Sequence, residues 1–243
     1  MKYNGIDPRT LHPAISINKE YPPGMAARTV TTVRGARAEH YAGIEQERSE
    51  YRVKVNIAAR TPEEAWHVRA LLAGWVNSAR GRVAALEPGK WPGRAYDAVP
   101  QTISAPEFQR GFATVEIIFV LPDGHPYETT TSRATGTGGK MTMQVGGAEM
   151  CRPILKQTMS AASNGLTWSL DGAAFLSLKG SLSAGQVVEV DMGTGGVTID
   201  GAHAENRVAY TSAQWEPGFW PGRRVVSSTS TGQMEARWHN VWD

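Results

Sequence analysis

The sequence has one cysteine, a balanced charge and no long apolar run, and each shortage excludes a class of protein. Cys151 is the single cysteine among 243 residues, which excludes an intrachain disulfide framework and any multi-cysteine metal site. The chain has 25 Lys and Arg residues and 23 Asp and Glu residues. Proteins that bind nucleic acid by neutralising its phosphates normally have a larger and more clustered excess of positive charge, so this balance disfavours that class. No stretch approaches the roughly 18 apolar residues of a membrane span, so we expect no membrane insertion. The opening MKYNGIDPRTLHP lacks the apolar core of a signal peptide, and we expect folding in a reducing cytoplasm.

Motifs for catalysis or cofactor binding are also missing. The stretch ATGTGGKM has Ala134 and Met141 where a phosphate-binding loop needs a glycine and a hydroxyl. Glu64 and His67 have Glu-x-x-His spacing, but a di-iron site needs a second such pair and four helices. No serine lies in a G-x-S-x-G elbow, and Cys151 is interpreted as a buried structural thiol. We therefore expect that the protein is not an enzyme and binds no cofactor or metal. A cell-wall hydrolase stays open as an alternative, because its two catalytic carboxylates can come from distant parts of the sequence and meet only in the folded protein.

One segment predicts an amphipathic helix. Hydrophobic residues make up 41% of the chain and charged residues 20%, a mixture typical of a globular protein with a core. In TPEEAWHVRALLAGWVNSA, Thr61 suits the N-cap, Pro62 the first helical position and Glu64 the reciprocal capping-box position. The apolar positions that follow share one helical face; they are Ala65, Val68, Leu72, Trp75, Val76 and Ala79.

Alternating segments predict the sheet against which this helix packs. Tyr51–Ile57 alternates apolar and polar residues with period two. Phe112–Leu121 is more continuously apolar and predicts a central strand covered on both faces. Further strands are expected at Ala14–Ile17, Thr29–Val33, Val83–Leu86 and Ala98–Ile103. Many strands with one helix predict an α+β domain, which we assign to residues 1–130.

A change of composition near the middle predicts a second domain. Thr129–Gly139 reads TTTSRATGTGG and has no apolar residue larger than alanine, which indicates a flexible linker, assigned to residues 131–140. From residue 141 to 243, short apolar runs alternate with Gly, Asn and Asp, which is typical of a β-sandwich or jelly roll. The expected fold is therefore mainly β with one α-helix. The runs are MTMQV, PILKQT, LTWSL, AFLSLKG, QVVEVDM, VTIDG, RVAYTS, RVVSST and MEARWHN.

Large aromatic residues gather in this second half, and two interpretations stay open. The favoured one is that they fill the sandwich core and its subunit contacts. The other is a sugar-stacking surface, since jelly rolls often serve as lectins, with Trp220 as the candidate glycan contact. The residues are Trp168, Trp215, Phe219, Trp220, Trp238 and Trp242.

The order of these features resembles the distal tail protein family of long, non-contractile-tailed bacteriophages. NGIDPR is close to the family's opening, and VRGARAEHYAG looks like its Gly/Arg loop, although Ala36 and Arg37 depart from the usual Gly-Arg-Asp-Gly. YRVKVNI then leads into the helix opened by TPEEAW, as in the family. LKGSLSAGQVVEVDMGTGGVTIDG and WEPGFWPGRRVV are similar to later family elements, with Gln186 at a frequent Asp and Arg223 at the Asn position.

The resemblance implies a structural part of the phage tail tip. It implies a first domain that closes into a homo-hexameric ring and a galectin-like β-sandwich second domain. The ring would join the tail tube protein to tail-associated hub and receptor-binding proteins and would let DNA pass without binding it specifically. The protein would be assembled in the host cytoplasm and reside in the virion. The alternative function is a carbohydrate-binding module for attachment to the host surface.

A polar segment of the first domain is the candidate ring contact. Arg34, Arg37 and Tyr41 lie in a charged stretch hinged by glycine and too polar for a core. A solvated hairpin loop is the equally weighted alternative.

Overall fold

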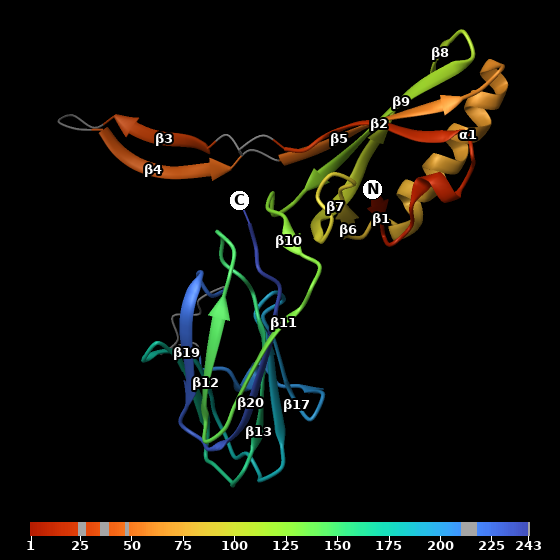
Figure 1. The fold of residues 1–243 in the computed structure, drawn as a ribbon. Helices are drawn as coiled ribbons and strands as arrows, with labels where there is room; N and C mark the ends of the chain where they lie inside the picture. The colour runs from red at the N-terminus through yellow and green to blue at the C-terminus, as the bar shows by residue number, and fades with distance from the viewer. Residues whose placement is uncertain (24–27, 35–38, 47–48, 210–217, 243) are drawn as a thin grey trace. The chain divides into compact units, whose positions relative to one another are not determined.

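The computed structural model describes residues 1–243 except 24–27, 35–38, 47–48, 210–217 and 243, and for 28–34 and 39–46 it describes the backbone. The chain forms two compact units, Met1–Pro126 and Tyr127–Asp243 (Figure 1). Each unit has its own cluster of buried apolar side chains. Each therefore folds around a separate core.

The first unit combines one α-helix with antiparallel strands. Six strands form its main sheet in the order β1-β6-β7-β9-β5-β2, and β8 pairs with β9. β5 and β9 pair over ten residues, and both lie inside the edges of this sheet. The elements are β1 (Lys2–Tyr3), η1 (Pro8–Thr10), β2 (Ile15–Tyr21), β3 (Arg28–Arg34), β4 (Glu39–Gln46), β5 (Ser49–Ala58), α1 (Pro62–Val76), η2 (Asn77–Ala79), β6 (Ala84–Glu87), β7 (Arg94–Ile103), β8 (Glu107–Gln109) and β9 (Phe112–Leu121).

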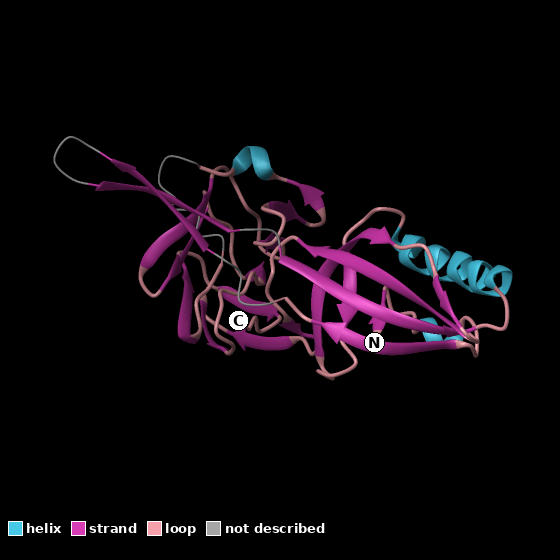
Figure 2. Cartoon of the chain, turned by 90° about the horizontal axis from the view of Figure 1, so that it is seen from above, coloured by secondary structure: helices cyan, strands magenta, loops and turns pink. Residues whose placement is uncertain are grey.

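Helix α1 begins as the capping signal predicts. The Thr61 hydroxyl accepts a hydrogen bond from the Glu64 N–H at 3.2 Å, and the Glu64 carboxylate accepts one from the Arg60 N–H at 2.7 Å. The first bond satisfies an N–H group that the first turn cannot pair internally. In the second, the Glu64 carboxylate reaches the N–H of Arg60, one residue before the N-cap N–H that a capping box uses. Figure 2 shows α1 lying along the strands of this unit. Five of the six predicted apolar positions are buried against the sheet; they are Ala65, Val68, Leu72, Trp75 and Val76.

The two faces of β9 differ in burial, which corrects one prediction. The odd-numbered side chains from Ala113 to Leu121 are buried with α1, whereas the even-numbered ones are partly or fully exposed. β9 is central, as expected, but it is not covered on both faces. Its apolar sequence is continuous because Ile118 and Val120 also occupy the less buried side, which we call the outer face of the sheet.

Strands β3 and β4 form a separate two-stranded sheet inserted between β2 and β5. We call strands β3 and β4, residues 28–34 and 39–46, the arm. In the main sheet, β2 and β5, which precede and follow the arm in the chain, pair with each other. The predicted strand Thr29–Val33 is confirmed within β3, while residues 39–43 of the expected polar loop belong to β4.

The second unit is an antiparallel β-sandwich, as expected. One sheet has the order β11-β20-β13-β16-β17-β18 and the other β12-β19-β14-β15, and side chains from both enter one core. The elements are β10 (Tyr127–Glu128), β11 (Ser132–Gly136), β12 (Lys140–Val145), β13 (Ile154–Met159), β14 (Leu166–Leu170), β15 (Ala173–Leu178), β16 (Val187–Asp191), β17 (Gly196–Ile199), β18 (Ala202–His203), η3 (Glu205–Arg207), β19 (Gly222–Ser228) and β20 (Gly232–Trp238).

The predicted strand runs of this unit are confirmed with one exception. Residues 207–209 of the run RVAYTS form the end of η3 and a single bridge between Leu178 and Val208, and the rest of that run lies outside the described residues. The sequence of this half shows no helical periodicity, and among its described residues the one helical element is the short 3-10 turn η3.

The predicted linker at 131–140 is wrong. Residues 132–136 form β11, which pairs along its whole length with β20, and the division between the units falls after Pro126. The glycines in this stretch are required by close packing rather than by flexibility. A Cβ at Gly136 would collide with the backbone of Lys140, and Gly139 has a φ of +73° and lies against the Ser230 carbonyl.

A buried polar network ties the two sheets of the sandwich together. The side chain of Gln157 on β13 is fully buried; its Oε1 accepts a hydrogen bond from Trp168 Nε1 at 2.6 Å, and its Nε2 donates one to the Ser230 carbonyl at 2.9 Å. Trp168 lies on β14, in the opposite sheet. Because buried polar groups are costly when unpaired, this network fixes how the sheets face each other.

Replacing Gln157 is expected to destabilise the second unit. Gln157→Leu leaves the Trp168 N–H and the Ser230 carbonyl buried without a partner, at a cost of about 2–4 kcal/mol. Urea unfolding of the full chain followed by tryptophan fluorescence measures the change. Gln233→Leu, the same substitution at an exposed position of β20, serves as the control; equal stability of the two variants would contradict the role of the network.

Candidate functional site

Two of the three residues proposed for a ring contact lie in the arm. Arg34 ends β3 opposite Glu39, and Tyr41 lies on β4 opposite Thr32. Both therefore lie in paired strands, which corrects their assignment to a loop. Arg37 lies outside the described residues. Trp220 belongs to the second unit, so the chain presents two separate candidate regions.

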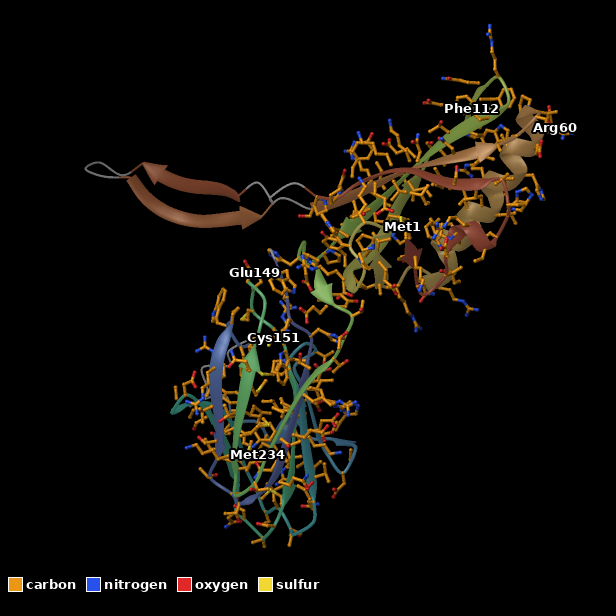
Figure 3. The ribbon with its side chains drawn as sticks, in the orientation of Figure 1. Met1, Arg60, Phe112, Glu149, Cys151 and Met234 are labelled. Carbon is orange, nitrogen blue, oxygen red and sulfur yellow. The ribbon has the colours of Figure 1, made fainter. Side chains whose placement is uncertain are left out.

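The outer face of the main sheet adds three apolar side chains to the first candidate region. Phe112 at the start of β9 is 42% exposed (Figure 3), and Ile118 and Val120 further along the same face are half-buried. Across the strand pair, Arg52 lies opposite Ile118 and Glu50 opposite Val120, and their side chains form an ion pair at 2.8 Å. Thr114 and Glu116 lie between Phe112 and Ile118 on this face. Exposed apolar side chains with a polar border are one arrangement found at protein interfaces.

The second candidate region is a hollow in the β-sandwich beside Trp220. Its volume is about 250 Å³, and it is lined by residues of β14, β15, β19 and the loop before β19. The Trp220 side chain is 53% exposed, while Phe175 is buried and packs edge-on against Phe219 with ring centroids 5.8 Å apart. The lining residues are Leu170, Asp171, Ala173, Ala174, Phe175, Trp220 and Arg224.

The hollow exists because the turn between β14 and β15 is tight and small residues follow it. Asp171 and Gly172 have φ values of +50° and +94°, as a two-residue hairpin turn requires. Ala173 and Ala174 then begin β15, and both are exposed. A methyl group at each of these positions fills little of the space beside Trp220.

An ion pair forms the polar side of the hollow. Arg224 Nη1 donates to Asp171 Oδ2 at 3.0 Å, and Asp171 Oδ1 accepts from the Val225 N–H at 2.8 Å. The bond from Val225, followed by that from Arg224, lowers the pKa of the Asp171 carboxyl below its ordinary value, so it stays an anionic acceptor. Arg224 also donates from Nε to the Trp220 carbonyl at 2.8 Å, which ties the loop carrying Trp220 to β19.

The sequence indicates one of the residues of this region. Trp220, the candidate glycan contact, is exposed, in contrast to the favoured interpretation that the aromatic residues fill the core. Asp171 and Arg224 were missed, because nothing in the sequence pairs residues 53 positions apart. The Asp-Gly dipeptide between two strand-like runs was the available signal, since it predicts a hairpin turn at this point.

The described residues give no support for metal or thiol chemistry. Among them, no group of three or more His, Cys, Asp or Glu is placed to hold a metal ion. Cys151 is confirmed as buried, inside the second unit (Figure 3), and burial raises the pKa of its thiol to about 12. The thiolate is the reactive form of cysteine, so this thiol is inert near neutral pH. In the described part of the chain, no helix has the length and apolarity of a membrane span.

We expect Cys151 to resist alkylation in the folded protein. Iodoacetamide at pH 8 should modify it slowly in buffer and rapidly in urea, as followed by intact mass. The pKa of the Cys151 thiol is higher in the folded protein, about 12, than in an unfolded chain, where it is about 8.5. The protonated thiol is therefore favoured by folding. Its contribution to the free energy of unfolding is fully present below about pH 8.5 and is lost as the pH rises towards 12. Rapid alkylation without denaturant would contradict the burial of this thiol.

Comparison with known proteins gives a family match for the second unit and similar solved structures for the whole chain. Residues 146–242 match the family described as siphovirus-type tail component, C-terminal domain. The fold of the whole chain is similar to the crystal structure of the Dit protein (gp 19.1) of phage SPP1, with a TM-score of 0.80 at 12% identity, covering 99% of this chain and 97% of that one. That protein is described as a paradigm of the hub adsorption apparatus in phages that infect Gram-positive bacteria.

Two further structures come from the baseplate of phage P2 in its activated conformation. The chain in the baseplate with Ca is matched with a TM-score of 0.56 at 7% identity, and the one with Sr with 0.51 at 8%. Each match covers 93% of this chain and 90% of the other. No curated protein matches the sequence. The comparisons confirm the resemblance to phage distal tail proteins that the order of sequence features indicated.

Proposed function

We propose that this chain is a ring-forming hub of a phage tail. The proposal is supported by the match of residues 146–242 to the family of siphovirus-type tail component C-terminal domains. Six copies would close a ring that joins the tail tube to the baseplate and its receptor-binding proteins. The observation that carries the proposal is the fold shared over 99% of the chain with a hub protein of the adsorption apparatus.

The first unit supplies the surfaces that a ring needs. A closed ring is built from heterologous contacts, in which two different patches of one chain meet on neighbouring copies. In the proposed ring, the arm would be one of these patches and the outer face of the sheet the other. A two-stranded sheet is marginally stable alone in water, so the arm gains stability by packing on another surface. Covering Phe112, Ile118 and Val120 removes apolar area from water, at roughly 25 cal/mol per Å².

The balance of charge suits a ring through which DNA passes. Lys and Arg exceed Asp and Glu by two over the whole chain. A wall with a strong positive field would hold phosphates and slow their passage. A near-neutral chain can build a lumen without such a field, so DNA would pass without being bound specifically.

Mass photometry of the purified chain tests the assembly. The expected particle has about six times the 26.3 kDa mass of one chain, and its fraction rises with concentration as mass action requires. A permanent ring of this kind should bury more than roughly 1,000 Å² at each contact. A chain that stays at 26.3 kDa at every concentration would refute self-assembly into a ring.

Charge reversal in the arm tests its part in the contact. Arg34→Glu combined with Arg37→Glu should weaken assembly at least about tenfold, on the order of 1.4 kcal/mol per contact. The reason is that each glutamate would face the hydrogen-bond acceptors that an arginine would contact on the neighbouring copy, and like charges repel. Arg80→Glu combined with Arg82→Glu makes the same charge change at two exposed positions of the segment after η2, away from the arm and the outer face, and should assemble as the wild type does. An unchanged oligomer in the arm variant would exclude these two arginines from the contact.

A further inference from the structure

We propose that the hollow beside Trp220 binds a single neutral sugar ring. The proposal concerns the second unit alone and stands apart from the ring proposed for the first. The same hollow would give the tail tip a weak contact of its own with saccharides on a cell surface.

The lining has the two kinds of surface that a pyranose ring presents. One face of a sugar ring carries C–H groups and packs on an aromatic ring, while its hydroxyls point outward and both donate and accept hydrogen bonds. Trp220 supplies an exposed aromatic surface at the hollow. Asp171 and Arg224 supply an acceptor and a donor on the same wall, with side chains 40% and 27% exposed.

The polar pair has bonding capacity left for a ligand. A carboxylate offers about four acceptor positions and a guanidinium five N–H groups. Asp171 uses one position on each oxygen, for Val225 and Arg224, and Arg224 donates three hydrogen bonds to the protein. Both groups are thus held in place by the protein and can still bond a hydroxyl. Such preorganisation lowers the entropy that a ligand must lose on binding.

Charge and size favour a neutral monosaccharide over other ligands. The positive charge of Arg224 is balanced by Asp171 at 3.0 Å, and the remaining lining residues are uncharged. An anion would therefore meet the Asp171 carboxylate, and an apolar ligand would strip water from the ion pair without replacing its hydrogen bonds. At about 250 Å³, the hollow lies just below the range of drug-sized pockets, which suits one ring.

Saturation-transfer NMR on the full chain tests the proposal. D-glucose, D-galactose, N-acetyl-D-glucosamine and L-rhamnose are each added at millimolar concentration, the range expected for a single ring in an open site. We expect transfer to the ring protons of at least one of them. No transfer to any of the four, or stronger transfer to D-glucuronate than to every neutral sugar, would overturn the proposal.

Two variants locate the site, and a third controls for exposed tryptophan. Trp220→Ala removes the stacking surface, and Ala174→Leu fills the hollow from an exposed position of β15; each should weaken binding at least about tenfold. Trp66→Ala removes a tryptophan of nearly equal exposure, 52%, from the first unit and should leave binding unchanged. Thermal unfolding verifies that the variants are folded. Equal binding by wild type and both hollow variants would overturn the assignment, whatever the oligomeric state.

Discussion

The structure of the first unit depends on one constraint, that a single helix covers one side of its sheet. Helix α1 buries the odd-numbered residues of β9 and their neighbours on β5. The other side of β9 carries Phe112, which is exposed, and Ile118 and Val120, which are half-buried, beside charged residues of β5. This outer face also holds Thr114 and Glu116, so it is mixed rather than apolar. The apolar side chains at its two ends are the part of the first unit that supports assembly with copies of itself.

The second unit is complete by comparison, because its two sheets cover each other. Gln157 and Trp168 join the sheets across the core, and the glycines of the β11–β12 turn let the backbones approach closely. A stable sandwich can carry a surface feature without losing its core. The hollow at Trp220 is such a feature: it is built from a two-residue turn, two alanines and an ion pair. The two units thus divide the proposed roles, the first for assembly and the second for surface contact.

Local signals in the sequence predicted the elements well. The cap at Thr61 and the apolar face from Ala65 to Val76 specified α1, and alternation specified β5, because these patterns reflect interactions within a few residues. The linker was predicted wrongly because β11 carries small and polar side chains, and its pairing with β20 involves residues about a hundred positions away. Backbone pairing of this kind leaves no mark on composition. The Asp171–Arg224 pair escaped prediction for the same reason, since it forms only when β19 lies beside β14.

The proposed ring is tested most directly by negative-stain electron microscopy of the purified chain. The account predicts face-on particles with six-fold symmetry and a central opening, formed without any other tail protein. Class averages that show only single two-lobed particles, or closed assemblies of another symmetry, would contradict it.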